Sequence, residues 1–188
     1  MLSSCGSYLK FKNDGVTGNL IDEENGRYYI YCLGYLQAAE INARVYAKGD
    51  GKPKETLHEI PGVDPSKWLS EDISKGVAFL FREQSEEEPR LEDFETAIIH
   101  ITMAEEITLS ISAITDKDEI DEIVNAYVNN DEVSLPEYIT ENFTLYFESE
   151  KYSGIYYVLQ YFIDDKNNSY LYDRWTRRCV LCGAGALN

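Results

Sequence analysis

Hydrophobic and polar residues alternate along most of this chain with a period of two, which is typical of β-strands buried on one face. In the first half, the alternation from Ile41 to Ala47 ends at a glycine-rich turn at 49–51. Upstream, the pair Asn25-Gly26 separates two apolar runs, and this pair favours a hairpin with a type I′ turn. The first half therefore predicts short strands joined by tight turns.

Two further signals follow before the middle of the chain. Asp64-Pro65 predicts a short helical turn, since Asp is a good N-cap and Pro fits the first helical position. The run 76–83, GVAFLFRE, predicts a strand. The next stretch is rich in acids and poor in apolar residues, so we predict an acidic linker or loop at 85–94.

The second half contains the single predicted helix, over about 116–129. Its apolar residues recur at helical spacing and predict one buried face. They are Ile120, Ile123, Val124, Tyr127 and Val128. Thr115 and Asp118 resemble a capping box at its start. Strands are predicted at 95–103 and 107–114 before the helix, and at 143–149, 154–163 and 169–182 after it, with connections short enough to require antiparallel pairing.

The predicted fold class is α+β: predominantly antiparallel β, with one amphipathic helix packed on a C-terminal antiparallel sheet. We divide the chain into an N-terminal tether at 1–14, a β-rich region at 15–84, the acidic segment at 85–94, and a β-β-α-β-β-β region at 95–188. The alternative is that 95–188 and 15–84 form a single domain.

The N-terminus carries a short motif at Leu2-Ser3-Ser4-Cys5. It resembles the lipobox of Gram-positive bacterial surface lipoproteins, in which an aliphatic residue and a small residue precede a cysteine that becomes lipidated. The resemblance implies lipidation of Cys5, and two or more acyl chains would anchor the protein stably. It also requires a true start upstream of Met1, and coincidence is the alternative.

A second stretch, Ile114-Thr115-Asp116-Lys117-Asp118-Glu119-Ile120, resembles the strand-to-helix junction of small extracytoplasmic domains in uncharacterised Gram-positive lipoproteins. The resemblance implies an extracytoplasmic location and an antiparallel sheet that carries one helix. Such families generally have no assigned activity.

The charge restricts the possible partners. The chain has 188 residues with 17 Lys or Arg and 34 Asp or Glu, a net charge of −17. A surface this negative repels polyphosphates, so nucleic acid is excluded as a partner, and so is direct binding to an anionic membrane. Contact with a membrane is therefore expected only through a lipid anchor.

No residue set predicts catalysis, a cofactor or a metal. Cys179 and Cys182 form a CxxC pair, but they end a strand instead of starting a helix, so we interpret them as structural. A disulfide between two of Cys32, Cys179 and Cys182 is the alternative. His58 and His100 lack an accompanying nucleophile motif.

One cluster departs from the overall acidity: Arg174, Trp175, Arg177 and Arg178 in DRWTRRC. On a strand, Arg174 and Arg178 would share one face, and Trp175 and Arg177 the other. We interpret the cluster as a candidate partner-binding patch. The alternative is that it pairs with the protein's own acids and protects a sheet edge.

These observations favour an extracytoplasmic lipoprotein, anchored by lipid at the bacterial cell surface, with a non-enzymatic binding role at the cell envelope. Its partner would be an unknown protein or small ligand. The alternative is a cytosolic acidic protein, such as an immunity protein that neutralises a basic toxin, because a net charge of −17 suits a basic partner.

Overall fold

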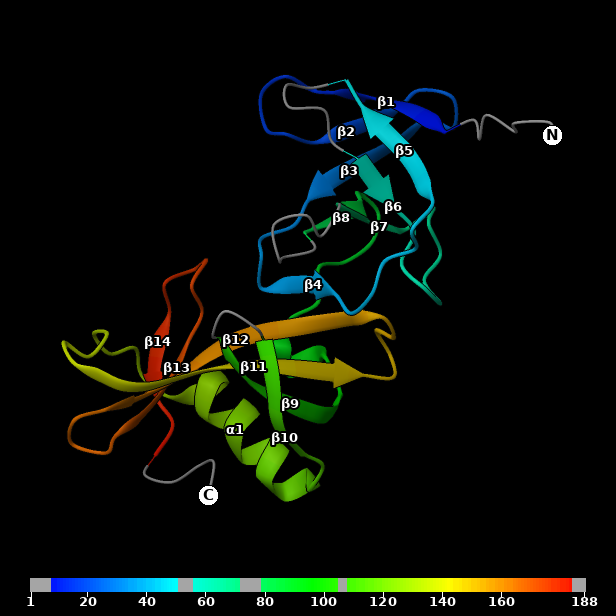
Figure 1. Cartoon of the computed structure of the whole chain (residues 1–188). Helices are drawn as coiled ribbons and strands as arrows, with labels where there is room; N and C mark the ends of the chain where they lie inside the picture. Colours follow the sequence, from blue (N-terminus) through cyan, green and yellow to red (C-terminus); the bar gives the residue numbers. More distant parts are fainter. Residues whose placement is uncertain (1–7, 51–55, 72–78, 105–107, 184–188) are drawn as a thin grey trace. The chain divides into compact units, whose positions relative to one another are not determined.

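The computed structural model describes residues 8–50, 56–71, 79–104 and 108–183. The chain divides into two compact units, which we call the N-terminal unit, Met1–Glu88, and the C-terminal unit, Pro89–Asn188. The boundary lies within the segment 85–94. Most of the described residues with regular structure are in β-strands, and they include one α-helix, α1 (Figure 1).

The N-terminal unit contains a closed barrel, with strand order β1-β2-β3-β8-β7-β6-β5. Neighbouring strands are antiparallel, except that β1 pairs in parallel with β5 and so closes the barrel. The strands of this unit are β1 (Leu9–Asn13), β2 (Leu20–Asp22), β3 (Arg27–Tyr31), β4 (Leu36–Ala38), β5 (Val45–Gly49), β6 (Thr56–His58), β7 (Trp68–Glu71) and β8 (Leu80–Glu83). The region predicted only as β-rich is thus a closed barrel, a closure that depends on pairing between distant strands.

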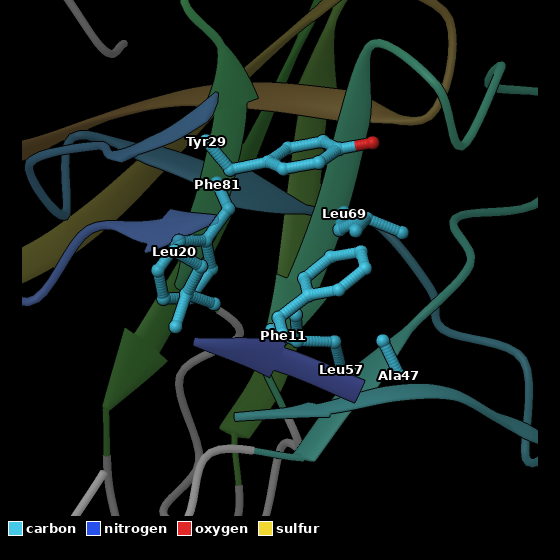
Figure 2. Close-up of a cluster of buried hydrophobic side chains, with 7 residues drawn as sticks. All are labelled: Phe11, Leu20, Tyr29, Ala47, Leu57, Leu69 and Phe81. Atoms are coloured by element: carbon cyan, nitrogen blue, oxygen red, sulfur yellow. The ribbon is translucent and has the colours of Figure 1, made fainter. Parts of the chain in front are cut away.

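The barrel encloses a cluster of seven buried side chains, drawn in Figure 2. Phe11 and Tyr29 stack on each other within it, with ring centroids 5.4 Å apart and planes 17° apart. The Tyr29 hydroxyl donates to the Pro65 carbonyl at 3.1 Å, so the ring is buried without leaving its polar end unpaired. The full set is Phe11, Leu20, Tyr29, Ala47, Leu57, Leu69 and Phe81.

The first strands differ from the sequence prediction at two points. Residues 9–13 form β1, so the predicted tether at 1–14 is wrong for these residues. The hairpin around Asn25-Gly26 is confirmed, but a four-residue loop, 23–26, joins its strands. Of these two residues only Gly26 has a positive φ, of 66°. The Asp22 carboxylate accepts from both nitrogens of Asn25, which organises the loop without a type I′ turn.

Two other predictions in this unit are adjusted. The strand predicted from Ile41 begins only at Val45, and its turn at 49–51 lies partly outside the described residues. At Asp64 the chain makes a single hydrogen-bonded turn: the Ser66 amide donates to the Asp64 carboxylate at 2.8 Å, and the Lys67 amide donates to its carbonyl at 2.9 Å. The turn leads directly into β7.

The C-terminal unit is an antiparallel sheet with α1 packed against it (Figure 1). Its own strands have the order β10-β9-β11-β12-β13-β14. The elements are the 3-10 turn η1 (Leu91–Asp93), β9 (Thr96–Ala104), β10 (Thr108–Ile114), α1 (Lys117–Asn129), β11 (Ile139–Ser149), β12 (Ile155–Asp164), β13 (Ser169–Tyr172) and β14 (Cys179–Leu181). The predicted meander after the helix is confirmed, but the run 169–182 forms two strands and not one.

The helix occupies the predicted residues, but its cap is different. Asp116 is the N-cap, and its carboxylate accepts from the amides of Asp118 and Glu119 at 3.0 and 3.1 Å, so Thr115 is not the cap. The buried face consists of Ile120, Ile123, Ala126 and Tyr127. This face contacts β9, β14 and η1.

The end of the acidic segment is also structured. Leu91 in η1 and Phe94 are buried, and Phe94 stacks on Tyr152 with ring centroids 5.1 Å apart. Leu91 and Phe94 are therefore part of the C-terminal unit's core, while Glu92 and Asp93 between them are exposed, so the predicted linker is shorter than 85–94. The pattern was misleading because these two apolar side chains are isolated among acids in the sequence.

Candidate functional site

The predicted cationic patch lies in the turn between β13 and β14, which comprises residues 173–178. The prediction that these residues alternate on a strand is therefore wrong. The turn presents Arg174, Trp175 and Arg177 outward, while Arg178 is partly buried. We call residues 174–177 the hairpin tip. The candidate site is consequently a short loop and not a strand face.

A buried aspartate fixes the base of this turn. Asp173 is 0% exposed, and its carboxylate accepts from the Trp175 amide at 2.7 Å and from the Thr176 hydroxyl at 2.8 Å. The Tyr127 hydroxyl of α1 also points toward this carboxylate, at 3.5 Å. Burial, followed by the nearby negative charge of Asp173, raises the pKa of Tyr127 to about 12, so this hydroxyl stays protonated. Asp173 therefore links the turn to the helix.

Arg178 fixes the other end of the turn by binding the C-terminus of α1. Its guanidinium donates to the carbonyls of Tyr127 and Asn130, at 3.2 and 3.0 Å, and to that of Val128 at 3.4 Å. It also lies over the Tyr127 ring, 5.6 Å from the centroid. A cation suits this position, because carbonyls without helical partners and the negative end of the helix dipole meet there. Arg178 thus holds the fold and is not part of an open patch.

The other two arginines of the turn, Arg174 and Arg177, are exposed. Within the part of the chain that the structure describes, no carboxylate forms an ion pair with Arg174 or Arg177. Trp175 between them is 42% exposed. Arg177 has a φ of 63°, a left-handed conformation that is unusual for a residue with a side chain. The tip therefore presents two guanidinium groups and an indole on a well-anchored loop.

The edge of the sheet beside this loop is already covered. Glu132 forms a β-bridge with Val180, and the Val133 amide donates to the Cys179 carbonyl at 2.8 Å. The segment after α1 thus runs along β14 and pairs with its backbone. Protection of this edge, the alternative interpretation of the arginines, is provided by backbone pairing instead.

Sequence reasoning missed Asp173, the residue that organises the site. A signal was present, because an Asp followed three positions later by Thr is typical of a turn in which the side chain binds the next backbone amides. The prediction of a single strand over 169–182 left no place for a turn at Asp173. The local composition identified the exposed residues but not the buried anchor.

The surroundings of the three cysteines that the structure describes do not favour redox or metal chemistry. Cys32, Cys179 and Cys182 are free and buried, so the alternative of a disulfide among them is not what the structure contains. Burial raises the pKa of Cys32 to about 12 and that of Cys182 to about 11, and it also raises that of Cys179. Thiols held neutral in this way are poor nucleophiles and poor metal ligands.

The two histidines lie in different units and have different partners. His58 is 5% exposed, and its Nδ1 lies 2.7 Å from the Asn42 carbonyl. On β9, His100 Nε2 lies 2.6 Å from Glu148 Oε2, and the ring packs edge-to-face on Tyr156. Among the described residues, no group of three or more His, Cys, Asp or Glu is placed to hold a metal ion.

The predicted lipidation residue, Cys5, lies outside the described residues. Within the described ranges, none of the helical structure is both long and apolar enough to cross a membrane. No known protein family, curated protein or solved structure matches this chain. The functional interpretation therefore depends on the geometry of the hairpin tip and on the charge.

Proposed function

We propose that this chain is a non-enzymatic binding protein of the bacterial cell envelope, lipid-anchored at Cys5, which contacts its partner through the hairpin tip. The observation that carries the proposal is the exposure of Arg174, Trp175 and Arg177 on a loop fixed at both ends. Exposed Trp and Arg are the residues most enriched where proteins bind their partners.

The anchoring of the loop supports the same role. Because Asp173 and Arg178 already order the turn, binding there requires less loss of conformational freedom than binding to an unanchored loop. Arg177 adopts its left-handed conformation where glycine would be easier to accommodate. Local strain of this kind is often retained at functional positions.

The net charge of −17 favours a second candidate, a cytosolic acidic protein that covers a basic partner such as a toxin. The two functions use different surfaces. An envelope protein of the proposed kind binds through the cationic tip, whereas an acidic inhibitor binds through its carboxylates and gains nothing from exposed arginines. A map of the contact surface therefore distinguishes them.

The contact surface is tested by photocrosslinking in the native cells. A photoreactive phenylalanine derivative is placed at position 175 and, in a control variant, at Ile139, whose exposure of 41% matches the 42% of Trp175. We expect a covalent adduct from position 175 and none from position 139. Equal adducts from both positions, or none from 175, would contradict binding at the tip.

The location is tested separately by mass analysis of the N-terminal peptide from membrane and soluble fractions. Lipidated Cys5 in the membrane fraction is the expected result. An unmodified N-terminus in the soluble fraction would refute the anchor and favour the acidic inhibitor. This result is independent of the crosslinking result, so the proposed location and the proposed contact surface can be refuted separately.

A further inference from the structure

We propose that the hairpin tip binds a ligand in which a ring carries a single carboxylate or phosphate group. This inference rests on the proposed binding role of the tip and specifies the chemistry of its partner. It follows from three features of the site: the kind of side chains exposed, the contrast between their local charge and the charge of the whole chain, and the anchoring of the loop.

The side chains define the two parts of the ligand. A guanidinium is a planar fork of donors that matches the oxygens of carboxylate and phosphate, and neither Arg174 nor Arg177 has an acid for an ion pair among the described residues. Trp175 stands between them in sequence, is the aromatic residue of the tip and is 42% exposed. An indole packs favourably against another ring. An anion beside a ring can therefore engage both kinds of group at once.

The charge of the whole chain limits the size of the anion. Charges further away than about 8 Å are largely screened at physiological ionic strength, so a small ligand experiences mainly the charges of the turn itself. These are Arg174, Arg177 and Arg178 against the single carboxylate of Asp173, which leaves the turn locally cationic. A long polyanion, or an anionic membrane, extends beyond the tip and meets a surface with a net charge of −17. The site consequently favours an isolated anionic group over a dense array.

The anchoring of the loop explains why three residues are enough to form a site. The Asp173 carboxylate accepts a hydrogen bond from the amide of Trp175, at the start of the tip. Arg178, the residue directly after the tip, is held to the end of α1 by its guanidinium. The backbone that carries the ligand-binding side chains is thus set by the fold before any ligand arrives. The ligand then orders only three side chains, which reduces the entropic cost of binding.

The test is NMR titration of the full chain labelled with ¹⁵N at tryptophan. The chain has two Trp residues, and Trp68 is 5% exposed, so its indole signal is an internal control for the signal of Trp175. The probes are phenyl phosphate, benzyl alcohol as a ring without charge, and inorganic phosphate as an anion without a ring. We expect phenyl phosphate to shift only the Trp175 signal, with an affinity at least about tenfold higher than either simpler probe, a difference of about 1.4 kcal/mol.

The variant R174Q/R177Q should bind phenyl phosphate about tenfold or more weakly than the parent chain does, because charge-assisted hydrogen bonds are replaced by weaker neutral ones. The matched control is K117Q/K166Q, which removes two cations elsewhere on the C-terminal unit and should bind as the parent does. Equal affinity for phenyl phosphate and inorganic phosphate would overturn the role of the ring. If heparin bound more tightly than phenyl phosphate at the same salt concentration, the preference of the tip for a single anionic group would be overturned.

These outcomes are separable from failure of the proposed function. If position 175 crosslinks in cells but no probe shifts the Trp175 signal, the tip is a contact surface and the proposed ligand class is wrong. If the probe binds but position 175 yields no adduct in cells, the chemistry of the tip is right and its use as the cellular contact surface is refuted.

Discussion

At the scale of single residues, part of the large acidic content serves local structure. Asp14, Asp164 and Asp173 each accept hydrogen bonds from backbone amides of the residues that follow them, and so hold three different turns. Such a carboxylate replaces the carbonyl that regular structure would supply. A formal charge of −17 thus overstates how much of the acidity is available to a partner.

Asp164 gives this idea a measurable pH dependence. Hydrogen bonds from the Asn168 side chain and backbone, and from the Tyr170 hydroxyl, lower its pKa to about 2 from the ordinary value of 3.8. Because the folded pKa is the lower one, Asp164 contributes its full stabilisation above about pH 4 and loses it as the pH falls through 2. The free energy of unfolding should therefore fall over this range.

The measurement is urea unfolding between pH 2 and 5 for the parent chain, Asp164→Asn and Asp165→Asn. The first substitution removes the titrating group and should flatten the acid dependence, while exposed Asp165 serves as the control. Other turn aspartates, such as Asp14, whose pKa is also lowered, keep some slope in every variant. Identical slopes for all three proteins would refute the role of Asp164.

At the scale of elements, α1 depends on a residue that is distant in sequence. Its last turn carries no Lys or Arg of its own, and Arg178 supplies the positive charge from the β13–β14 turn. We expect Arg178→Met to destabilise the chain by about 1–3 kcal/mol, because several hydrogen bonds to a charged donor are lost. Arg177→Met is the control and should change stability by less than about 0.5 kcal/mol.

Urea unfolding gives these stabilities, and amide exchange locates the effect. In Arg178→Met, the last-turn amides of α1, up to that of Asn130, should exchange faster while the first turn, capped by Asp116, keeps its protection. Equal losses in the two variants would mean that the arginines act through general charge and not through the helix end.

An element could be predicted from the sequence where the residues that specify it lie close together in the chain. The helix was predicted within a residue because its apolar spacing and acidic start lie within one segment. The hairpin of β2 and β3 was predicted for the same reason. Closure of the barrel was not, because it requires β1 to pair with β5, and no local pattern encodes the register between strands so far apart.

The candidate site shows the same limit. Composition singled out Arg174, Trp175 and Arg177, and these are the exposed residues of the tip. It could not separate them from Arg178, because that requires knowing that the end of α1 lies beside the turn. Asp173 was overlooked, since a buried anchor and an exposed acid look alike in a sequence with many acids.

At the scale of the whole molecule, each unit has a core of its own. Phe11 is 1% exposed inside the barrel, and Phe147 on β11 of the C-terminal unit is 0% exposed. The two side chains belong to separate compact units of the chain. Units with separate cores can open separately, with free energies set by their own packing.

We therefore expect Phe11→Ala and Phe147→Ala each to cost about 3–5 kcal/mol, the usual loss for a buried aromatic ring, but in different parts of the chain. Amide exchange should show lost protection in β1–β8 for the first variant and in β9–β14 for the second. Val16→Ala, at a position 89% exposed, is the control and should leave both patterns unchanged. Loss of protection throughout the chain in both variants would mean that the two cores unfold together. A partner bound at the hairpin tip would then stabilise the barrel of the N-terminal unit as strongly as it stabilises the C-terminal unit, which carries the tip.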